Sequence, residues 1–146
     1  MNKRIKSLHE RANMLEKVRK FFSERKVLEV DCPILSAYAS VDAHIDLIQT
    51  ISEERRFLHS SPEYCMKRLL AEGFPDIYQM SHVFRSGDIG KKHNPEFMMV
   101  EWYRRGFSLQ QMFEETVDFI RLFLGNIKFS VISYKEAFIR YTGIDP

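Results

Sequence analysis

The stretch Val83–Tyr103, VFRSGDIGKKHNPEFMMVEWY, decides the fold expected for this chain of 146 residues. The segments Asp76–Arg85 and Phe97–Arg104 are rich in aromatic and β-branched residues and too short for a helix, so they predict two strands. The loop between them contains two glycines and the basic run Lys91–His93. Glycine permits backbone conformations closed to other residues, and the basic run adds positive charge at the tip. The stretch therefore predicts a strand pair joined by a phosphate-holding loop.

Alternation divides the second strand into two faces, because side chains two residues apart point the same way. One face carries Phe97, Met99, Glu101 and Tyr103; the other carries Met98, Val100 and Trp102, which are expected to lie in the core. The first face has an aromatic ring at one end and a carboxylate at the other, separated by about 13 Å of strand. This spacing suits a purine at one end and an amine at the other. Taken alone, Glu101 fits an exposed cross-strand partner equally well. On the first strand, the expected pocket face carries Gln79, Ser81, Val83 and Arg85.

Composition sets limits on the class of protein. Hydrophobic residues make up 45% and charged residues 29%, which are values of a globular domain. The net charge is only +2, so no global field favours nucleic acid or an anionic membrane. Cys32 and Cys65 have no partners at metal-site spacing, which indicates neither a structural metal nor a disulfide framework. The chain has no signal-peptide pattern and no apolar run long enough to span a membrane, so a cytoplasmic location is expected.

The segment before the strand pair predicts a helix, a strand and a loop. Apolar residues recur at helical spacing over Asn2–Lys26, and the strand Val27–Val30 follows. On pattern alone, this is a surface helix packed on a sheet. A loop and a pair of short strands are expected next, at Leu35–Asp46, Leu47–Ile51 and Arg56–His59. Within the loop, His44 is either a ligand contact or a polar loop residue.

Four further elements are expected, and capping and stop signals mark two of the helices among them. Ser61 is a good N-cap with Pro62 at the first helical position, and this helix is expected to run to Glu72 and end at Gly73. Glu63 then lies in the first turn, where an acid interacts favourably with the helix dipole. The C-terminal elements are expected as a helix, a strand and a short helix, at Ser108–Leu124 with Gly125 as the stop, Lys128–Ile132 and Tyr134–Tyr141.

The motifs FR, GKKHNPEF and EWY, in this order, resemble motif 2 of the class II aminoacyl-tRNA synthetases, here at about residues 83–103. Within the lysine-specific branch, they are most similar to the elongation factor P lysine ligases, which are truncated synthetase paralogs. FFSERKVLEVDCPIL looks like motif 1, at about residues 14–33, which builds the dimer interface of that class. The resemblance implies an α+β fold, an antiparallel sheet flanked by helices, within one incomplete catalytic domain over residues 1–146. It also implies a homodimer.

Matching positions imply the roles of individual residues. Arg85 would hold the α-phosphate of ATP and carry the catalytic role, and Phe97 would stack on adenine. The loop residues implied in ATP binding are Lys91, His93 and Asn94. SSPEYCMKRLLAEG resembles the family segment whose glutamate, here Glu63, holds the substrate α-amino group. Glu101 and Tyr103 would bind the side-chain ammonium of the substrate.

The implied activity is ATP-dependent formation of a lysine or β-lysine adenylate and transfer to a lysine of elongation factor P. Two departures from the family pattern matter. Gly87 stands where the family has a glutamate, although Asp88 is adjacent, and the glycine-rich motif 3 is absent. The magnesium that the family uses would have its ligands outside this chain. A non-catalytic module that dimerises or binds nucleotide is therefore the alternative. A fragment of a lysyl-tRNA synthetase is the third possibility, disfavoured because no anticodon-binding domain precedes motif 1, so no tRNA partner is expected.

Overall fold

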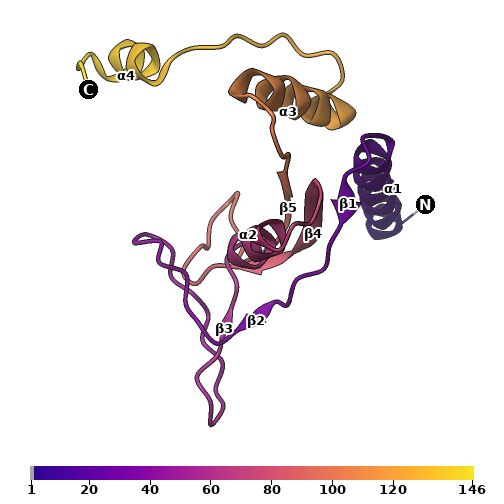
Figure 1. Cartoon of the computed structure of the whole chain (residues 1–146), viewed down its shortest axis with the longest axis vertical. Helices are drawn as coiled ribbons and strands as arrows, with labels where there is room; N and C mark the ends of the chain where they lie inside the picture. Colours follow the sequence, from indigo (N-terminus) through magenta and orange to yellow (C-terminus); the bar gives the residue numbers. More distant parts are fainter. Residues whose placement is uncertain (1) are drawn as a thin grey trace. The chain divides into compact units, whose positions relative to one another are not determined.

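The computed structural model describes residues 2–146, which form two compact units, one up to Ser108 and one over Leu109–Pro146. Figure 1 labels the elements along the chain. Those of the first unit are α1 (Lys3–Glu24), β1 (Leu28–Glu29), β2 (Leu35–Ser36), β3 (Phe57–Leu58), α2 (Glu63–Ala71), β4 (Ile77–Phe84) and β5 (Glu96–Tyr103). Those of the second are α3 (Leu109–Leu124) and α4 (Tyr134–Thr142). The α+β class predicted from the sequence is confirmed.

The strands that position the site form a three-stranded sheet in the order β1-β4-β5. β4 and β5 pair antiparallel, with a register that runs from Ile77 opposite Tyr103 to Phe84 opposite Glu96. The expected antiparallel pairing is present between β4 and β5, and the edge strand β1 departs from it by pairing with β4 in parallel. The physical reason is the long connection through α2, which returns the chain to the same end of the sheet before β4 begins.

α1 packs on one face of this sheet through its last turns. Its start is capped by Asn2, whose Oδ1 accepts from the Arg4 N–H at 2.9 Å. Phe22 is fully buried and stacks on Tyr78 of β4 at 4.2 Å between ring centroids, with Trp102 of β5 at 5.6 Å. Lys26 has φ +56°, a left-handed conformation that turns the chain from α1 towards β1. The predicted motif 1 helix and strand are therefore present, with a shorter strand.

α2 packs on the other face of the sheet. Its Met66 is fully buried in a cluster with Cys32 and Ile77, and Tyr103 packs against them. Pro62 is the N-cap, one residue later than the Ser61 predicted, although the Ser61 Oγ still accepts from the Glu63 N–H at 3.1 Å. A left-handed Gly73, with φ +97°, follows the helix as predicted. The β4–β5 pair thus lies between α1 and α2.

The burial of a strand's side chains depends more on whether the strand is in the middle or at the edge of the sheet than on which face the side chains occupy. β4, the middle strand, holds the buried side chains, whereas the residues of β5 after Glu96 are half-buried on both faces. The prediction that Met98, Val100 and Trp102 form the core is therefore wrong in degree, because β5 has a strand neighbour on one side only. The buried side chains of β4 are Ile77, Tyr78, Gln79, Ser81 and Val83.

The segment between β1 and α2 contains one strand that was expected to be loop. β2 lies inside Leu35–Asp46 and pairs antiparallel with β3. The predicted pairing of Leu47–Ile51 with Arg56–His59 is confirmed by the Thr50 N–H to Arg56 carbonyl bond and the Leu58 N–H to Ile48 carbonyl bond, both at 2.9 Å.

The second unit contains the two predicted helices. α3 ends at a left-handed Gly125, with φ +71°, and α4 begins with a reciprocal capping box between Ser133 and Glu136. The predicted strand Lys128–Ile132 is wrong: the segment is irregular. Its apolar residues line a hollow of about 310 Å³ with side chains of α3, so the pattern serves packing on a helix rather than strand pairing.

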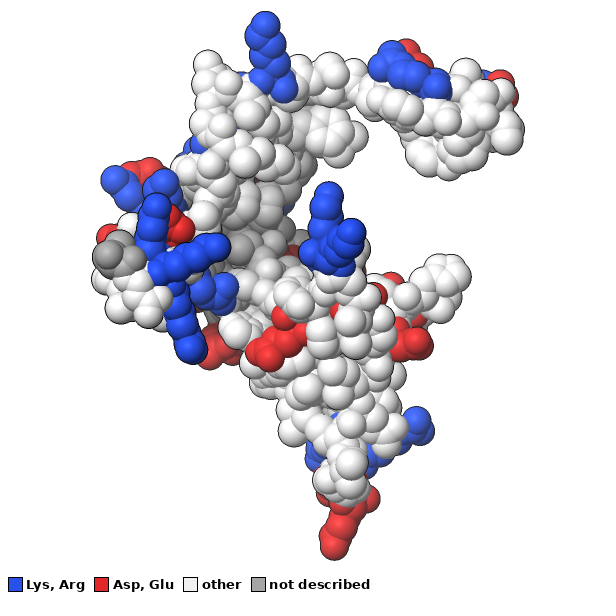
Figure 2. All heavy atoms as spheres, turned by 180° about the vertical axis from the view of Figure 1, so that it is seen from behind, with Lys and Arg blue, Asp and Glu red and all other residues white. Residues whose placement is uncertain are grey.

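Two further properties of the helices are the basic surface of α1 and the length of their apolar segments. In Figure 2 the basic side chains gather over α1. Its basic residues are Lys3, Arg4, Lys6, Arg11, Lys17, Arg19 and Lys20. No helix within residues 2–146 combines the length and the apolar composition needed to cross a membrane.

Candidate functional site

A carboxylate network joins the start of α2 to the end of β5. Glu101 is half-buried and accepts two hydrogen bonds, from the Ser61 Oγ at 2.5 Å and from the Tyr103 hydroxyl at 2.7 Å. Burial, together with the bond to Glu101, raises the pKa of Tyr103 well above its usual range, so this phenol stays protonated and donates. A carboxylate offers about four lone-pair positions, so Glu101 retains capacity for an ammonium.

Glu63 is connected to this network through the same serine. Its backbone N–H donates to the Ser61 Oγ, and its side chain forms an ion pair with the Lys67 ammonium one turn further along α2. The pKa of Lys67 is raised by that hydrogen bond and by the charge of Glu63. An ammonium group therefore already occupies the position that the resemblance assigns to the substrate amine, and a substrate would compete with Lys67 for this carboxylate.

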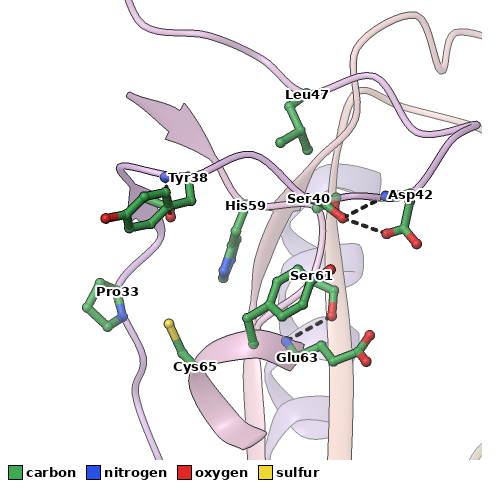
Figure 3. A pocket seen from close by; sticks show the side chains of 12 residues that line it. Pro33, Tyr38, Ser40, Asp42, Leu47, His59, Ser61, Glu63 and Cys65 are labelled. Carbon is green, nitrogen blue, oxygen red and sulfur yellow. Dashed lines mark hydrogen bonds between the residues drawn. The ribbon is translucent and has the colours of Figure 1, made fainter. Parts of the chain in front are cut away.

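A small pocket opens beside Ser61 and Glu63. Figure 3 shows the side chains of His59, Glu63 and Cys65 around it, with the Ser61–Glu63 hydrogen bond at its floor. Its volume is about 50 Å³, which gives room for a few water molecules rather than for a whole lysine. Binding of an amino acid here would therefore require the lining to open.

The second end of the site combines a cation with an aromatic ring. Arg85 follows β4 directly, and its guanidinium lies 5.2 Å from the centroid of the Phe97 ring. The Arg85 Nε is buried and has no hydrogen-bond partner among the described residues. A buried guanidinium nitrogen that lacks an acceptor favours an anion such as a phosphate. Phe97 lies opposite Val83 in the register, on the same face as Glu101.

Arg85 also lines a polar hollow of about 380 Å³ formed by residues 44–46 and 85–88. His44 contributes to it, so the structure places this histidine beside Arg85. Gly87 has φ +79°, a conformation that an L-glutamate adopts only with strain, and the half-buried Asp88 lines the same hollow. Asp88 is therefore the first acidic residue after Arg85 in the sequence, and it lines the same hollow as Arg85.

The basic loop between β4 and β5 is held by backbone hydrogen bonds at two places. The Arg85 N–H donates to the Pro95 carbonyl at 2.9 Å, and Gly90 and His93 form a bridge through both backbone groups. Lys91, Lys92, His93 and Asn94 are all exposed. The loop therefore extends the β4–β5 hairpin and presents its cations to solvent, in reach of an incoming ligand but separate from the half-buried Arg85.

Ser61 and Gln79 have contacts in the structure that the sequence did not predict. Ser61 was expected only as a helix cap, yet it joins Glu63 to Glu101. Gln79 is 1% exposed and holds the backbone of Cys32 with both ends of its amide, at 2.8 Å from the Cys32 N–H and 3.3 Å from its carbonyl. Gln79 lies opposite Glu101 in the register, which the alternation had placed on the pocket face. A polar residue at an otherwise apolar strand position was the available signal.

Curated relatives match this chain over nearly its whole length. A relative from Avibacterium paragallinarum, named elongation factor P--(R)-beta-lysine ligase, is 43% identical over 97% of this chain and 46% of its own length. Relatives of the same name from Hamiltonella defensa and Haemophilus influenzae are 39% and 40% identical over the same shares. The chain thus spans about half the length of the curated relatives it matches.

The family of tRNA synthetases class II (D, K and N) matches residues 1–145. The match includes both ends of the site, Arg85 with Phe97 and Glu101 with Tyr103. It also includes the helix, strand and proline that resemble motif 1. The chain therefore belongs to the class II tRNA synthetase family that comprises the D, K and N types.

Proposed function

We propose that this chain provides the nucleotide and amino acid binding half of a ligase that activates lysine or β-lysine with ATP as an adenylate. The complete enzyme would pass the activated group to a lysine side chain of elongation factor P, in the cytoplasm. The observation that carries this proposal is one strand face with two ends. Arg85 and Phe97 lie at one end, and Glu101 and Tyr103 lie at the other.

At the nucleotide end, the proposed reaction needs a fixed cation. Activation joins the substrate carboxylate to the α-phosphate and releases pyrophosphate, so charge develops on the phosphate oxygens. Arg85 would hold that phosphate, because its half-buried guanidinium has an unused donor and cannot lose its charge. The exposed side chains of Lys91, His93 and Asn94 would meet the outer phosphates, and Phe97 would stack on adenine.

At the amine end, Glu101 would bind the side-chain ammonium and Glu63 the α-amino group. Tyr103 and Ser61 hold the Glu101 carboxylate by donating to both of its oxygens, which orients it before the substrate arrives. The α-amino group would replace the Lys67 ammonium at Glu63. A substrate with two separated amines, such as lysine or β-lysine, meets both carboxylates.

The part of the chain that the structure describes does not fit a magnesium ion. Within residues 2–146, no group of three or more His, Cys, Asp or Glu side chains is arranged to hold a metal ion. We therefore assign no magnesium ligand here and derive no step through the metal.

Association through α1 is part of the proposal. Its first turns expose apolar side chains, with Ile5 at 47%, Leu8 at 59% and Met14 at 50%. Such residues on a helix whose last turns pack on the sheet support a second copy as their partner, in a homodimer through motif 1. No tRNA partner is proposed.

A non-catalytic module is the second candidate, favoured by Gly87. Its left-handed φ of +79° means that the loop beside Arg85 has a backbone unsuited to the glutamate of the family pattern. Under this reading, the chain binds nucleotide and a partner but does not form an adenylate.

Exchange of pyrophosphate into ATP, measured with lysine and with β-lysine, separates the two candidates. Arg85→Ala is expected to abolish exchange and to weaken ATP binding in calorimetry, whereas Arg140→Ala in α4 serves as the matched control and should change neither. Exchange is measured in the complete enzyme, and nucleotide binding without exchange there would support the module. Unchanged ATP binding in Arg85→Ala would refute the assignment of the nucleotide end.

A further inference from the structure

The fold brings the two cysteines of this chain together. Cys32 follows β1 and is 5% exposed in the cluster with Met66 and Ile77, and Cys65 of α2 packs against that cluster. Cys65 therefore borders the same buried cluster in which Cys32 lies. Both are free thiols. Two segments that are far apart in the sequence thus place two sulfurs in one small volume.

The backbone around both thiols is held in place. Gln79 accepts from the Cys32 N–H and donates to the Cys32 carbonyl, so this residue is fixed where the β1 ladder ends. Cys65 lies in the first turn of α2, next to Met66, which is fully buried. Neither thiol can move far without disturbing a buried contact. We therefore expect the two thiols to react with each other rather than with a thiol of a second chain.

The two thiols differ in access. Cys65 is half-buried and lines the pocket beside Ser61 and Glu63, where Figure 3 shows its sulfur pointing into the pocket on the side of Pro33. Cys32 is not among the residues that line it. A small polar oxidant that enters the pocket therefore meets Cys65 first.

We propose that Cys65 and Cys32 are a peroxide-responsive thiol pair, which closes to a disulfide at the edge of the amino acid pocket. In the first step, the Cys65 thiolate attacks hydrogen peroxide, the O–O bond breaks, and Cys65 becomes a sulfenic acid as hydroxide leaves. In the second step, the Cys32 sulfur attacks the Cys65 sulfur, the S–O bond breaks, and the departing oxygen takes up the Cys32 proton to leave as water. Overall, two thiols and one peroxide give one disulfide and two waters.

The order of the two steps agrees with the environment of Cys32. Burial, followed by the neighbouring Cys65 and Asp31, raises the pKa of Cys32 to about 11. Cys32 is therefore a neutral thiol under ordinary conditions and unsuited to attack peroxide itself. At pH values below that pKa, the rate of its attack on the sulfenic acid should rise about tenfold for each unit of increase in pH, because the thiolate fraction of Cys32 rises in that proportion.

Closure would change the pocket and not the nucleotide end. A disulfide ties the segment of Cys32 and Pro33 to α2 and removes the Cys65 thiol from the pocket lining that it shares with Glu63. This consequence rests on the proposed function, because it assumes that the amino acid binds there. Arg85 and Phe97 lie at the hairpin end of the β4–β5 pair, away from this pocket lining, so ATP binding should be retained.

The test treats the complete chain with hydrogen peroxide and maps its peptides by mass spectrometry without reduction. We expect an intrachain Cys32–Cys65 peptide that has lost two hydrogen atoms, which disappears on treatment with dithiothreitol. Cys32→Ser should instead leave a sulfenic acid on Cys65 that dimedone traps, and Cys65→Ser should leave Cys32 unmodified at the same peroxide dose. Two free thiols after treatment, or crosslinks between chains only, would overturn the proposal.

A second measurement tests the effect on the pocket. Lysine affinity of the oxidised protein, measured by calorimetry, is expected to fall at least tenfold and to recover on reduction, with ATP affinity unchanged. A mapped disulfide with unaltered lysine affinity would refute the effect on the pocket while leaving the thiol pair in place. Failure of lysine to bind the reduced protein would refute the proposed function instead, since the peptide map does not depend on it.

Discussion

Replacing Glu101 by glutamine should weaken lysine binding far more than it weakens ATP binding. In Glu101→Gln, one carboxylate oxygen becomes an amide donor, and the formal charge is lost. The hydroxyls of Ser61 and Tyr103, which now donate at 2.5 and 2.7 Å, can rotate to accept from that amide. The free energy of unfolding should therefore change by about 1 kcal/mol or less.

The substrate ammonium can only donate hydrogen bonds, so it cannot compensate for the loss of the carboxylate as the two hydroxyls can. A hydrogen bond to a charged acceptor contributes about 1.5–3 kcal/mol, which corresponds to a loss of about 10- to 150-fold in lysine affinity. ATP affinity should remain within about twofold, because Arg85 and Phe97 lie about 13 Å further along the strand. Calorimetric titration of both ligands, with urea unfolding in parallel, measures the three quantities.

Glu96→Gln is the matched control on the same strand. Glu96 is exposed, pairs with His82 and takes no part in the Glu101 network. It should leave both affinities unchanged. Equal losses for lysine and ATP in Glu101→Gln, or equal losses of lysine affinity in both variants, would refute the division of the strand into an amine end and a nucleotide end.

Three further predictions concern stability. Phe22→Ala should lower the free energy of unfolding by about 3–5 kcal/mol, because its ring is fully buried between α1 and the sheet; a loss under about 1 kcal/mol in urea unfolding would contradict this packing. Gln79→Leu should cost about 2 kcal/mol or more, since it leaves the Cys32 N–H and carbonyl unpaired, and unchanged stability would show that water replaces the amide. Stability should fall as the pH rises from 9.0 towards 11, because the unfolded chain releases the Cys32 proton that the folded chain retains; Cys32→Ser should flatten that slope, and an identical slope would exclude this thiol as its origin.

Local signals in the sequence were sufficient for the elements whose pattern is set by near neighbours. Helical spacing over Asn2–Lys26 predicted α1, and capping and stop signals up to Gly73 predicted α2. Alternation predicted which face of β5 carries Glu101. The strand pair β4–β5 was predictable because its short loop leaves antiparallel pairing as the only geometry. Family motifs then assigned roles to Arg85 and Phe97 that no periodicity could supply.

Other features depended on segments distant in the sequence. The parallel pairing of β1, the strand at Leu35–Ser36 and the irregular course of 128–132 depend on which partner a segment meets, and a short apolar run does not encode its partner. The same holds for side chains. Ser61 was visible only as a cap until the fold set it beside Glu101.

The sequence by itself determined the α+β class, the family and the face of the strand on which the site lies, because periodicity and ordered motifs are written in neighbouring residues. Only the tertiary structure decided that Ser61 joins Glu63 to Glu101, that Gln79 holds Cys32, and that Cys65 packs against the cluster that contains Cys32. These contacts arise where α2 packs on the sheet. The burial of Met66 and Ile77 in that packing determines which residues meet, and no spacing along the chain does so.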